Sequence, residues 1–238
     1  MPEQLLIIRN ITHEGPGLLE GLLHKHGIAT HIEDLSQRGT FPDPRQYRAV
    51  VVLGGPQSAN DETPVMQLEL RQIKRVLDEE IPYLGICLGM QMLIKAAGGT
   101  VIPCPEREIG FTESSGNPYQ IELTAAGRAD ALFAELGSTL PVFQLHGETV
   151  QLPPSGTQLL ASGSLCHNQV VKAGANAYGL QCHFELTRSM FSELLNIDSD
   201  LKRMNHTELL GQFDELNEEY NFVGRKLMEN FLKIAGLL

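Results

Sequence analysis

Cys87 has the surroundings of a nucleophile. It lies between Gly85 and Gly89 in the stretch YLGICLGMQML, where a short apolar run gives way to a helix-forming run. This G-x-C-x-G spacing is typical of a nucleophile elbow, a sharp strand-to-helix turn that holds one side chain above a sheet. Glycine suits such a turn because a Cβ on either side would clash with neighbouring backbone. The pattern alone is equally consistent with a small buried cysteine at a tight turn.

A second candidate group ends a strand-like run near residue 183. In GLQCHFE, Glu185 follows His183 by two positions, and this spacing puts both side chains on the same side of an extended chain. A carboxylate there can bind one imidazole nitrogen and orient the other, as a cysteine nucleophile requires. His-x-Glu alone is also typical of a solvated pair at a strand end. Together, the two patterns favour catalysis by Cys87, His183 and Glu185.

An α/β fold is expected to position these candidates. Residues 4–97 alternate apolar strand-like runs with amphipathic helical runs, which indicates an open, mostly parallel twisted sheet with helices on both faces. Residues 100–186 contain short strand-like pieces and one short helix near 130–135, which predicts an antiparallel or mixed extension of the same sheet. We find no linker or internal repeat, so we expect one domain over 1–238, with a helical C-terminal segment from about 187.

Charge and composition exclude several classes of function. The chain has 18 Lys and Arg against 29 Asp and Glu, a net charge of -11, so nucleic acid is not an expected partner. The N-terminus has no basic segment before a long apolar run, and no later run approaches the ~20 residues of a membrane span. We therefore expect a cytoplasmic protein without a membrane partner. The four cysteines are too few and too irregularly spaced for a disulfide scaffold.

A metal-binding or redox-sensing protein is a competing interpretation. It would use the adjacent pairs Cys166-His167 and Cys182-His183. Adjacent ligands point apart on a strand, and neither pair follows a usual zinc spacing. We therefore expect no metal site and no cofactor.

Five motifs resemble, in order along the chain, the class I (triad-type) glutamine amidotransferase family, and in detail the glutaminase module of GMP synthase and its stand-alone relatives. The resemblance implies a flavodoxin-like core, which is an open, mostly parallel sheet with added β-structure. It covers most of the chain before the C-terminal helical segment. The motifs are VLGGPQS, PYLGICLGMQML, REIGF, LHGETVQLPP and NAYGLQCHFE.

The resemblance also implies roles for individual residues. Cys87 would be the nucleophile, His183 its acid and base, and Glu185 the group that orients His183. The backbone N–H groups of Gly55 and Leu88 would form the oxyanion hole. The residues expected near the bound glutamine are Gln91 and the backbone around Leu145 and His146.

The implied reaction is hydrolysis of the side-chain amide of glutamine through a cysteine thioester, which releases ammonia, with a separate synthase subunit as its expected user. The alternative substrate class is γ-glutamyl peptides or amides, which the protein would hydrolyse alone with the same triad. A cysteine α/β-hydrolase is disfavoured, because in that class the acid lies between nucleophile and histidine in chain order. Here Glu185 follows His183.

Two positions depart from the family's pattern. Phe184 stands between the histidine and the glutamate, where the family usually has proline, so the orientation of Glu185 is less constrained by the chain. Glu148 stands where aspartate is common, which lengthens any contact with a substrate amino group by one methylene. Neither departure removes a catalytic atom.

Overall fold

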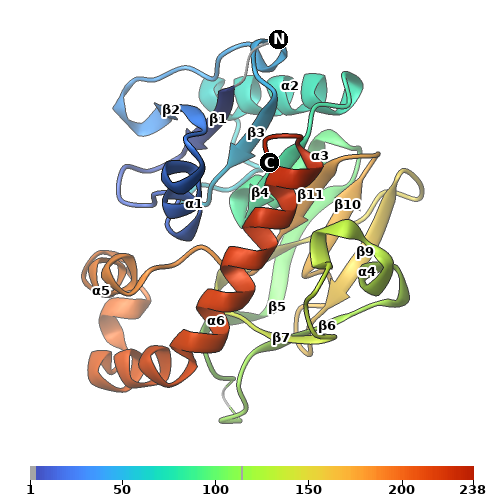
Figure 1. Cartoon of the computed structure of the whole chain (residues 1–238). Helices are drawn as coiled ribbons and strands as arrows, with labels where there is room; N and C mark the ends of the chain where they lie inside the picture. Colours follow the sequence, from blue (N-terminus) through green and yellow to red (C-terminus); the bar gives the residue numbers. More distant parts are fainter. Residues whose placement is uncertain (1–3, 114) are drawn as a thin grey trace.

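The larger of two β-sheets carries the helices on its faces (Figure 1). A computed structural model describes residues 4–113 and 115–238. Within them this sheet has nine strands in the order β2-β1-β3-β4-β11-β10-β9-β6-β7. The pairs from β2 to β11 are parallel, and those from β11 to β7 are antiparallel. The bounds are β1 Gln4–Arg9, β2 Ala29–Asp34, β3 Ala49–Val52, β4 Tyr83–Ile86, β6 Gln120–Leu123, β7 Thr139–Pro141, β9 Thr157–Ser162, β10 Val170–Ala173 and β11 Ala177–Leu180.

Side chains cap the N-termini of several helices. The side chain of Thr63 accepts from the Met66 N–H at the start of α2, and Asn205 accepts from Glu208 N–H at the start of α6. Such caps satisfy N–H groups that have no partner inside the helix. The helices are α1 Leu18–His26, α2 Pro64–Asp78, α3 Leu88–Ala96, α4 Ala125–Ala129, α5 Arg188–Ile197 and α6 His206–Ile234, with 3-10 turns at Leu35–Gln37, Pro44–Gln46, Ala131–Phe133 and Leu201–Arg203.

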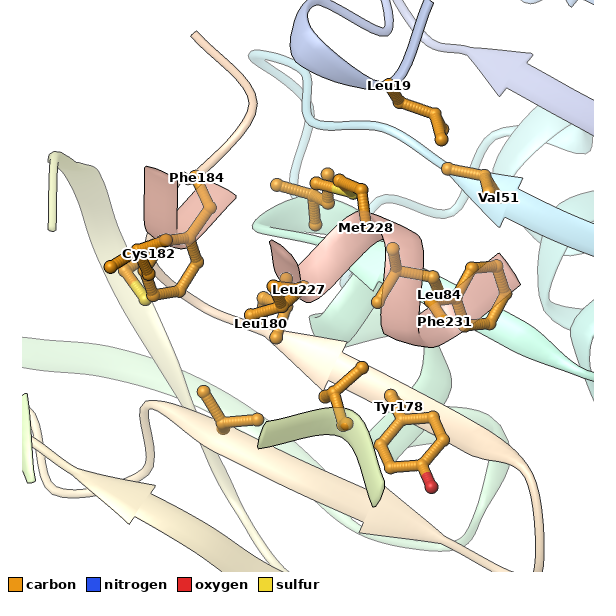
Figure 2. Packing of buried hydrophobic residues seen from close by; sticks show 14 of the residues in the cluster. Leu19, Val51, Leu84, Tyr178, Leu180, Cys182, Phe184, Leu227, Met228 and Phe231 are labelled. Carbon is orange, nitrogen blue, oxygen red and sulfur yellow. The ribbon is translucent and has the colours of Figure 1, made fainter. Parts of the chain in front are cut away.

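The predicted α/β class with an antiparallel extension is confirmed. Helices α1 and α6 pack on one face of the large sheet, and α2 and α3 on the other. On the first face, Leu19 of α1 and Phe231 of α6 pack over Val51 and Leu84 of the central strands (Figure 2). The central strands are buried on both faces, as is typical of a parallel sheet covered by helices. None of the described helices is long and apolar enough to cross a membrane.

A third hydrophobic cluster holds the C-terminal segment. We call residues 188–220, which include α5 and the first half of α6, the cap. Aromatic rings join the cap to the β-structure, with Phe111 to Phe191 at 5.4 Å and Phe111 to Phe213 at 5.7 Å between centroids. Edge-to-face pairs at such distances are favourable beyond the area that they bury. The cap is therefore packed on the domain rather than extended from it.

The second sheet corrects one sequence-based expectation. Residues 100–186 were expected to extend a single sheet, but among the described residues β5 (Thr100–Gly110) pairs with β8 (Gln144–Gln151) alone, in a separate two-stranded sheet. β5 was not expected as a strand, because Pro103 and Pro105 and the charged residues after them break its apolar alternation. The pairing register of β5 with β8 shifts between Pro103 and Glu108, because the prolines have no N–H to donate to β8. The short helix expected near 130–135 is only a 3-10 turn at Ala131–Phe133, and α4 lies just before it at Ala125–Ala129.

The two glycines around Cys87 allow close backbone contact. A Cβ on Gly89 would lie 2.2 Å from the carbonyl oxygen of Val52 in β3, and a Cβ on Gly85 would lie 2.4 Å from the carbonyl carbon of Gly89. Both distances are much shorter than a van der Waals contact. The atoms belong to the backbone, so they cannot rotate away as a side chain could. Glycine at these positions thus lets α3 start directly against β3 and β4.

We expect Gly89→Ala to lower the free energy of unfolding by about 2 kcal/mol or more, because strand or helix backbone must move. Urea unfolding measures the change. Gly21→Ala in α1 is the matched control: its Cβ meets no atom within 4 Å, so helix propensity should raise stability by up to ~1 kcal/mol. Equal stability of Gly89→Ala and wild type would contradict the packing described.

Candidate active site

Three loops meet at the carboxyl edge of the parallel strands. They follow β3, β4 and β11, which are neighbours in the sheet. Val52 lies beside Gly85, and Ile86 lies beside Leu180, so the chain leaves all three strands at one level. The residues after these ends include Gly55, Cys87 and His183. Crevices outside the carboxyl ends of parallel strands are where open α/β sheets bind ligands.

Cys87 occupies the turn between β4 and α3 in a rare backbone conformation. Its φ is 50° and its ψ is -104°, a region that non-glycine residues adopt at a cost of about 1–3 kcal/mol. The turn is held because the Cys87 N–H donates to the Leu180 carbonyl at 2.7 Å. The thiol has Sγ 3.9 Å from the Leu145 carbonyl oxygen and 3.7 Å from Gln181 Nε2. The side chain is 8% exposed, and it lines a cavity.

His183 lies beside Cys87 and is held by Glu185. Its Nδ1 is 2.6 Å from Glu185 Oε1. A Cβ on Gly54 would lie 3.5 Å from the His183 ring and 3.6 Å from the Cys87 Cβ, so both side chains border the same point. Burial alone would lower the pKa of His183, but the charge of Glu185 and hydrogen bonds with Cys87 and Glu185 raise it well above its usual value. The carboxylate and the thiol thus both favour the charged form of the imidazole.

The backbone of His183 is fixed from two sides. Its N–H donates to Phe143 at 2.9 Å, and its carbonyl accepts the Tyr220 hydroxyl of α6 at 3.0 Å. Phe143 and Tyr220 both belong to the aromatic cluster that holds the cap. The imidazole is therefore positioned by the cap as well as by the sheet.

Phe184 anchors Glu185 in a way that proline could not. Its backbone N–H donates to Glu185 Oε2 at 3.0 Å, a bond that a proline has no hydrogen to make. Its ring is fully buried in the core and lies next to Cys182 (Figure 2). Both oxygens of Glu185 are thus engaged, one by the imidazole and one by the chain.

Gly55 and Leu88, the expected oxyanion donors, lie next to each other. Leu88 is the first residue of α3, and N–H groups of a first helical turn have no carbonyl partner within the helix. Gly55 lies in the loop after β3 and lines the same cavity as Cys87. A Cβ on Gly55 would lie 2.7 Å from Asn10 Cβ and 3.4 Å from Leu88 Cδ2, so the loop packs tightly against the start of α3.

The remaining candidate residues lie on β8 or contact it. Gln91 of α3 donates from Nε2 to the Glu148 carbonyl at 3.1 Å, which links the helix to this strand. The Leu145 carbonyl contacts the thiol, whereas the His146 ring is buried against Glu108, with Nε2 to Oε2 at 2.9 Å. Backbone around Leu145 therefore borders the thiol, and the imidazole of His146 belongs to a separate buried cluster.

A cavity of about 610 Å³ opens over the thiol. The cap supplies one wall of it, residues 197–200 between α5 and the following turn. Acidic side chains outnumber basic ones in the lining, and Arg107 pairs with Asp200 across the mouth. The charged lining residues are Glu14, Arg107, Glu148, Asp198 and Asp200.

Glu14 is a buried carboxyl in the cavity that the sequence motifs did not indicate. Burial raises its pKa to about 7, opposed by the charge of His183 and reinforced by Glu185 and Asp198. It follows β1, the strand next to β3, so its loop leaves the same edge of the sheet. Its position at the end of the first parallel strand was the one signal that could have identified it. Asp198 and Asp200 come from the cap, for which no motif was available.

Comparison with known proteins assigns the family. The model of the glutamine amidotransferase class-I family matches residues 23–197, so the chain belongs to that family. The match ends where α5 ends, and α6 lies outside it.

Relatives include stand-alone and multidomain proteins. The glutamine amidotransferase-like protein YfeJ of Salmonella typhimurium is 36% identical over 151 residues, 61% of this chain and 60% of YfeJ. A glutamine-hydrolysing GMP synthase of Porphyromonas gingivalis is 32% identical over 143 residues, 60% of this chain and 26% of the synthase. The aligned part is thus less than two thirds of either relative. A glutamine amidotransferase structure from Thermotoga maritima has a TM-score of 0.84 and 28% identity, and covers 98% of this chain and 99% of its own.

We expect Glu14→Gln to stabilise the protein at high pH. The folded-state pKa of about 7 lies above the ordinary value of 4.5, so the stability associated with the protonated carboxyl is lost as pH rises between these values. The neutral amide avoids this loss. The free energy of unfolding, measured in urea, should exceed that of wild type by about 1–3 kcal/mol at pH 8, and the two should match near pH 4.5.

The control for this pH dependence is Glu122→Gln on the exposed face of β6. Its difference from wild type should be the same at both pH values. A Glu14→Gln difference that does not change with pH would contradict the burial of an ionisable carboxyl in the cavity.

Proposed function

We propose that the protein hydrolyses the side-chain amide of glutamine through a thioester on Cys87 and releases ammonia. The observation that carries this proposal is the strained turn that puts the thiol beside His183, whose other ring nitrogen is held at 2.6 Å by Glu185. Nucleophile, acid-base group and orienter are the three parts that cysteine-dependent acyl transfer needs. Membership of the class I glutamine amidotransferase family supports the choice of substrate.

In the first half of the reaction, the Cys87 thiolate attacks the carboxamide carbon. The N–H groups of Gly55 and Leu88 stabilise the oxyanion, each contributing about 3 kcal/mol to the transition state. His183 gives its proton to the departing nitrogen, so ammonia leaves and a γ-glutamyl thioester remains. The raised pKa of His183 suits this step, because the imidazole starts in the protonated form.

In the second half, the neutral imidazole of His183 takes a proton from water as the oxygen attacks the thioester. Collapse of the tetrahedral intermediate returns the thiolate and releases glutamate. Glu185 stabilises the imidazolium that forms in this step and keeps Nε2 directed at the thiol. We place the glutamine beside Gln91 and the backbone of Leu145 and His146.

A separate synthase subunit is the proposed user of the ammonia. The relatives named as glutamine-hydrolysing GMP synthases match this chain over about a quarter of their length, which supports a division between ammonia production and its use. We also propose a cytoplasmic location, in keeping with four cysteines that are all free.

A γ-glutamyl peptide or amide is the second candidate substrate, and the cavity favours it. Its volume of about 610 Å³ lies well within the ~300–1,000 Å³ of pockets that enclose drug-sized ligands, so it has room beyond the side chain of glutamine. Cap residues Asp198 and Asp200 form one wall of the cavity. A substrate with an additional group on the γ-amide nitrogen would contact this wall.

Covalent labelling tests the nucleophile. We expect a chloroketone analogue of glutamine to label the folded protein at Cys87, located by peptide mass spectrometry. Cys87→Ser should lower the rate of glutamine hydrolysis by about 10³-fold or more. Cys182→Ala, which changes a fully buried cysteine, should keep both labelling and activity. Full activity in Cys87→Ser, or labelling elsewhere only, would exclude the proposed mechanism.

Substrate comparison distinguishes the two candidates. Release of ammonia from glutamine is measured beside release of the amine or amino acid from γ-glutamyl amides and dipeptides, without any partner protein. If the cavity is filled by a group beyond the γ-amide, kcat/KM for a dipeptide should exceed that for glutamine by about 10-fold or more. Higher kcat/KM for glutamine would favour the amidotransferase role.

A further inference from the structure

A largely buried cluster of sulfur and nitrogen ligands lies beside the cavity, which His146 also lines. Cys104 comes from β5, His146 from β8 and Cys166 from the loop before β10. Their ligand atoms all lie within 4.8 Å of one another. The proposed hydrolysis uses none of these side chains, and the cluster stands independently of it.

The spacing fits a tetrahedral metal ion. Cys104 Sγ is 3.5 Å from His146 Nδ1. Zinc binds sulfur at about 2.3 Å and nitrogen at about 2.0–2.1 Å, so two such ligands at a tetrahedral angle are about 3.6 Å apart. The pair is therefore already at the separation that a shared ion requires.

His146 is oriented as a metal-binding histidine. Its Nε2 lies 2.9 Å from Glu108 Oε2, and Glu108 is itself fixed by the Gln169 amide at 3.0 Å. A carboxylate that accepts from one imidazole nitrogen leaves the lone pair of the other available, and this arrangement is typical behind metal ligands. Here the available nitrogen is Nδ1, which faces Cys104 and also lies 3.2 Å from the Glu148 carbonyl.

The environment suits a divalent ion more than a disulfide. Glu108 and Cys166 are 1% and 3% exposed, and two thiolates would neutralise the charge of the ion in this buried place. The Thr149 hydroxyl lies 2.9 Å from Cys166 Sγ, where it can donate to a thiolate. A disulfide between Cys104 and Cys166 would involve no imidazole, and the orientation of His146 by Glu108 would then have no chemical role.

We propose that Cys104, His146 and Cys166 bind one Zn²⁺ ion, with a fourth position for water. The ion joins β5, β8 and the loop before β10. Because His146 lies between Leu145, which contacts the nucleophile, and Glu148, which Gln91 holds, the ion braces the segment of β8 that borders the active site. The site differs from the pairs suggested by adjacency in the sequence, Cys166-His167 and Cys182-His183, because His183 is held by Glu185 and Cys182 is in the core.

Metal titration of the full chain tests the proposal. Protein purified with reductant and stripped with a chelator is titrated with Co²⁺, whose thiolate complexes absorb in the near ultraviolet, and Zn²⁺ is then added in competition. We expect one ion per chain, displacement of Co²⁺ by Zn²⁺, and a higher melting temperature with Zn²⁺. Absence of stoichiometric binding would overturn the proposal.

Variants locate the ligands. Cys104→Ala and Cys166→Ala should each lower Zn²⁺ affinity by more than 100-fold, and Glu108→Gln by about 10–100-fold through the orientation of His146. His167→Ala, an exposed neighbour of Cys166, is the matched control and should bind as wild type does. Unchanged affinity in both cysteine variants would overturn the assignment.

Alkylation of the wild-type protein tests the site without a variant that could misfold. In the wild-type protein, Zn²⁺ should slow alkylation of Cys104 and Cys166 by at least 10-fold and leave the rate at Cys87 much less affected. Oxidation of Cys104 and Cys166 to a disulfide in air, at a rate that Zn²⁺ does not alter, would assign the pair to redox chemistry and overturn the metal site.

Discussion

The turn at Cys87 is the constraint on which the active site depends. A non-glycine residue at φ 50° is stable only if its surroundings determine it, and here they do. The bond from its N–H to Leu180 fixes it to β11, and the contact of Gly89 with the Val52 carbonyl seats α3 on β3. The same contacts therefore hold the nucleophile and set the distance between the three loops around it.

Buried charge is the second organising feature. Burial would lower the pKa of His183, but Glu185 and Cys87 raise it well above its usual value. Burial raises the pKa of Glu14 to about 7, opposed by the charge of His183 and reinforced by those of Glu185 and Asp198. Burial disfavours the charged form of both groups, and the charge of Glu185 reverses that effect only at His183.

Local patterns predicted much of this arrangement, and long-range pairing accounts for what they missed. The elbow at Cys87 and the His183 segment are encoded by residues two positions apart, so the sequence shows their geometry directly. Glu14 and the cap residues belong to no short pattern. Cys104 and His146 meet because β5 pairs with β8, and prolines in β5 hide that strand from periodicity.

The cap has a consequence for how this domain can diversify. The residues of the elbow and of the His183 segment precede the cap along the chain, and α6 lies beyond the residues matched by the family model. One wall of the cavity, by contrast, is built from residues 197–200. Under the proposed function, the cap residues that would contact the substrate and the residues that would break the amide bond lie in different stretches of the gene, so mutation can change one set while selection preserves the other.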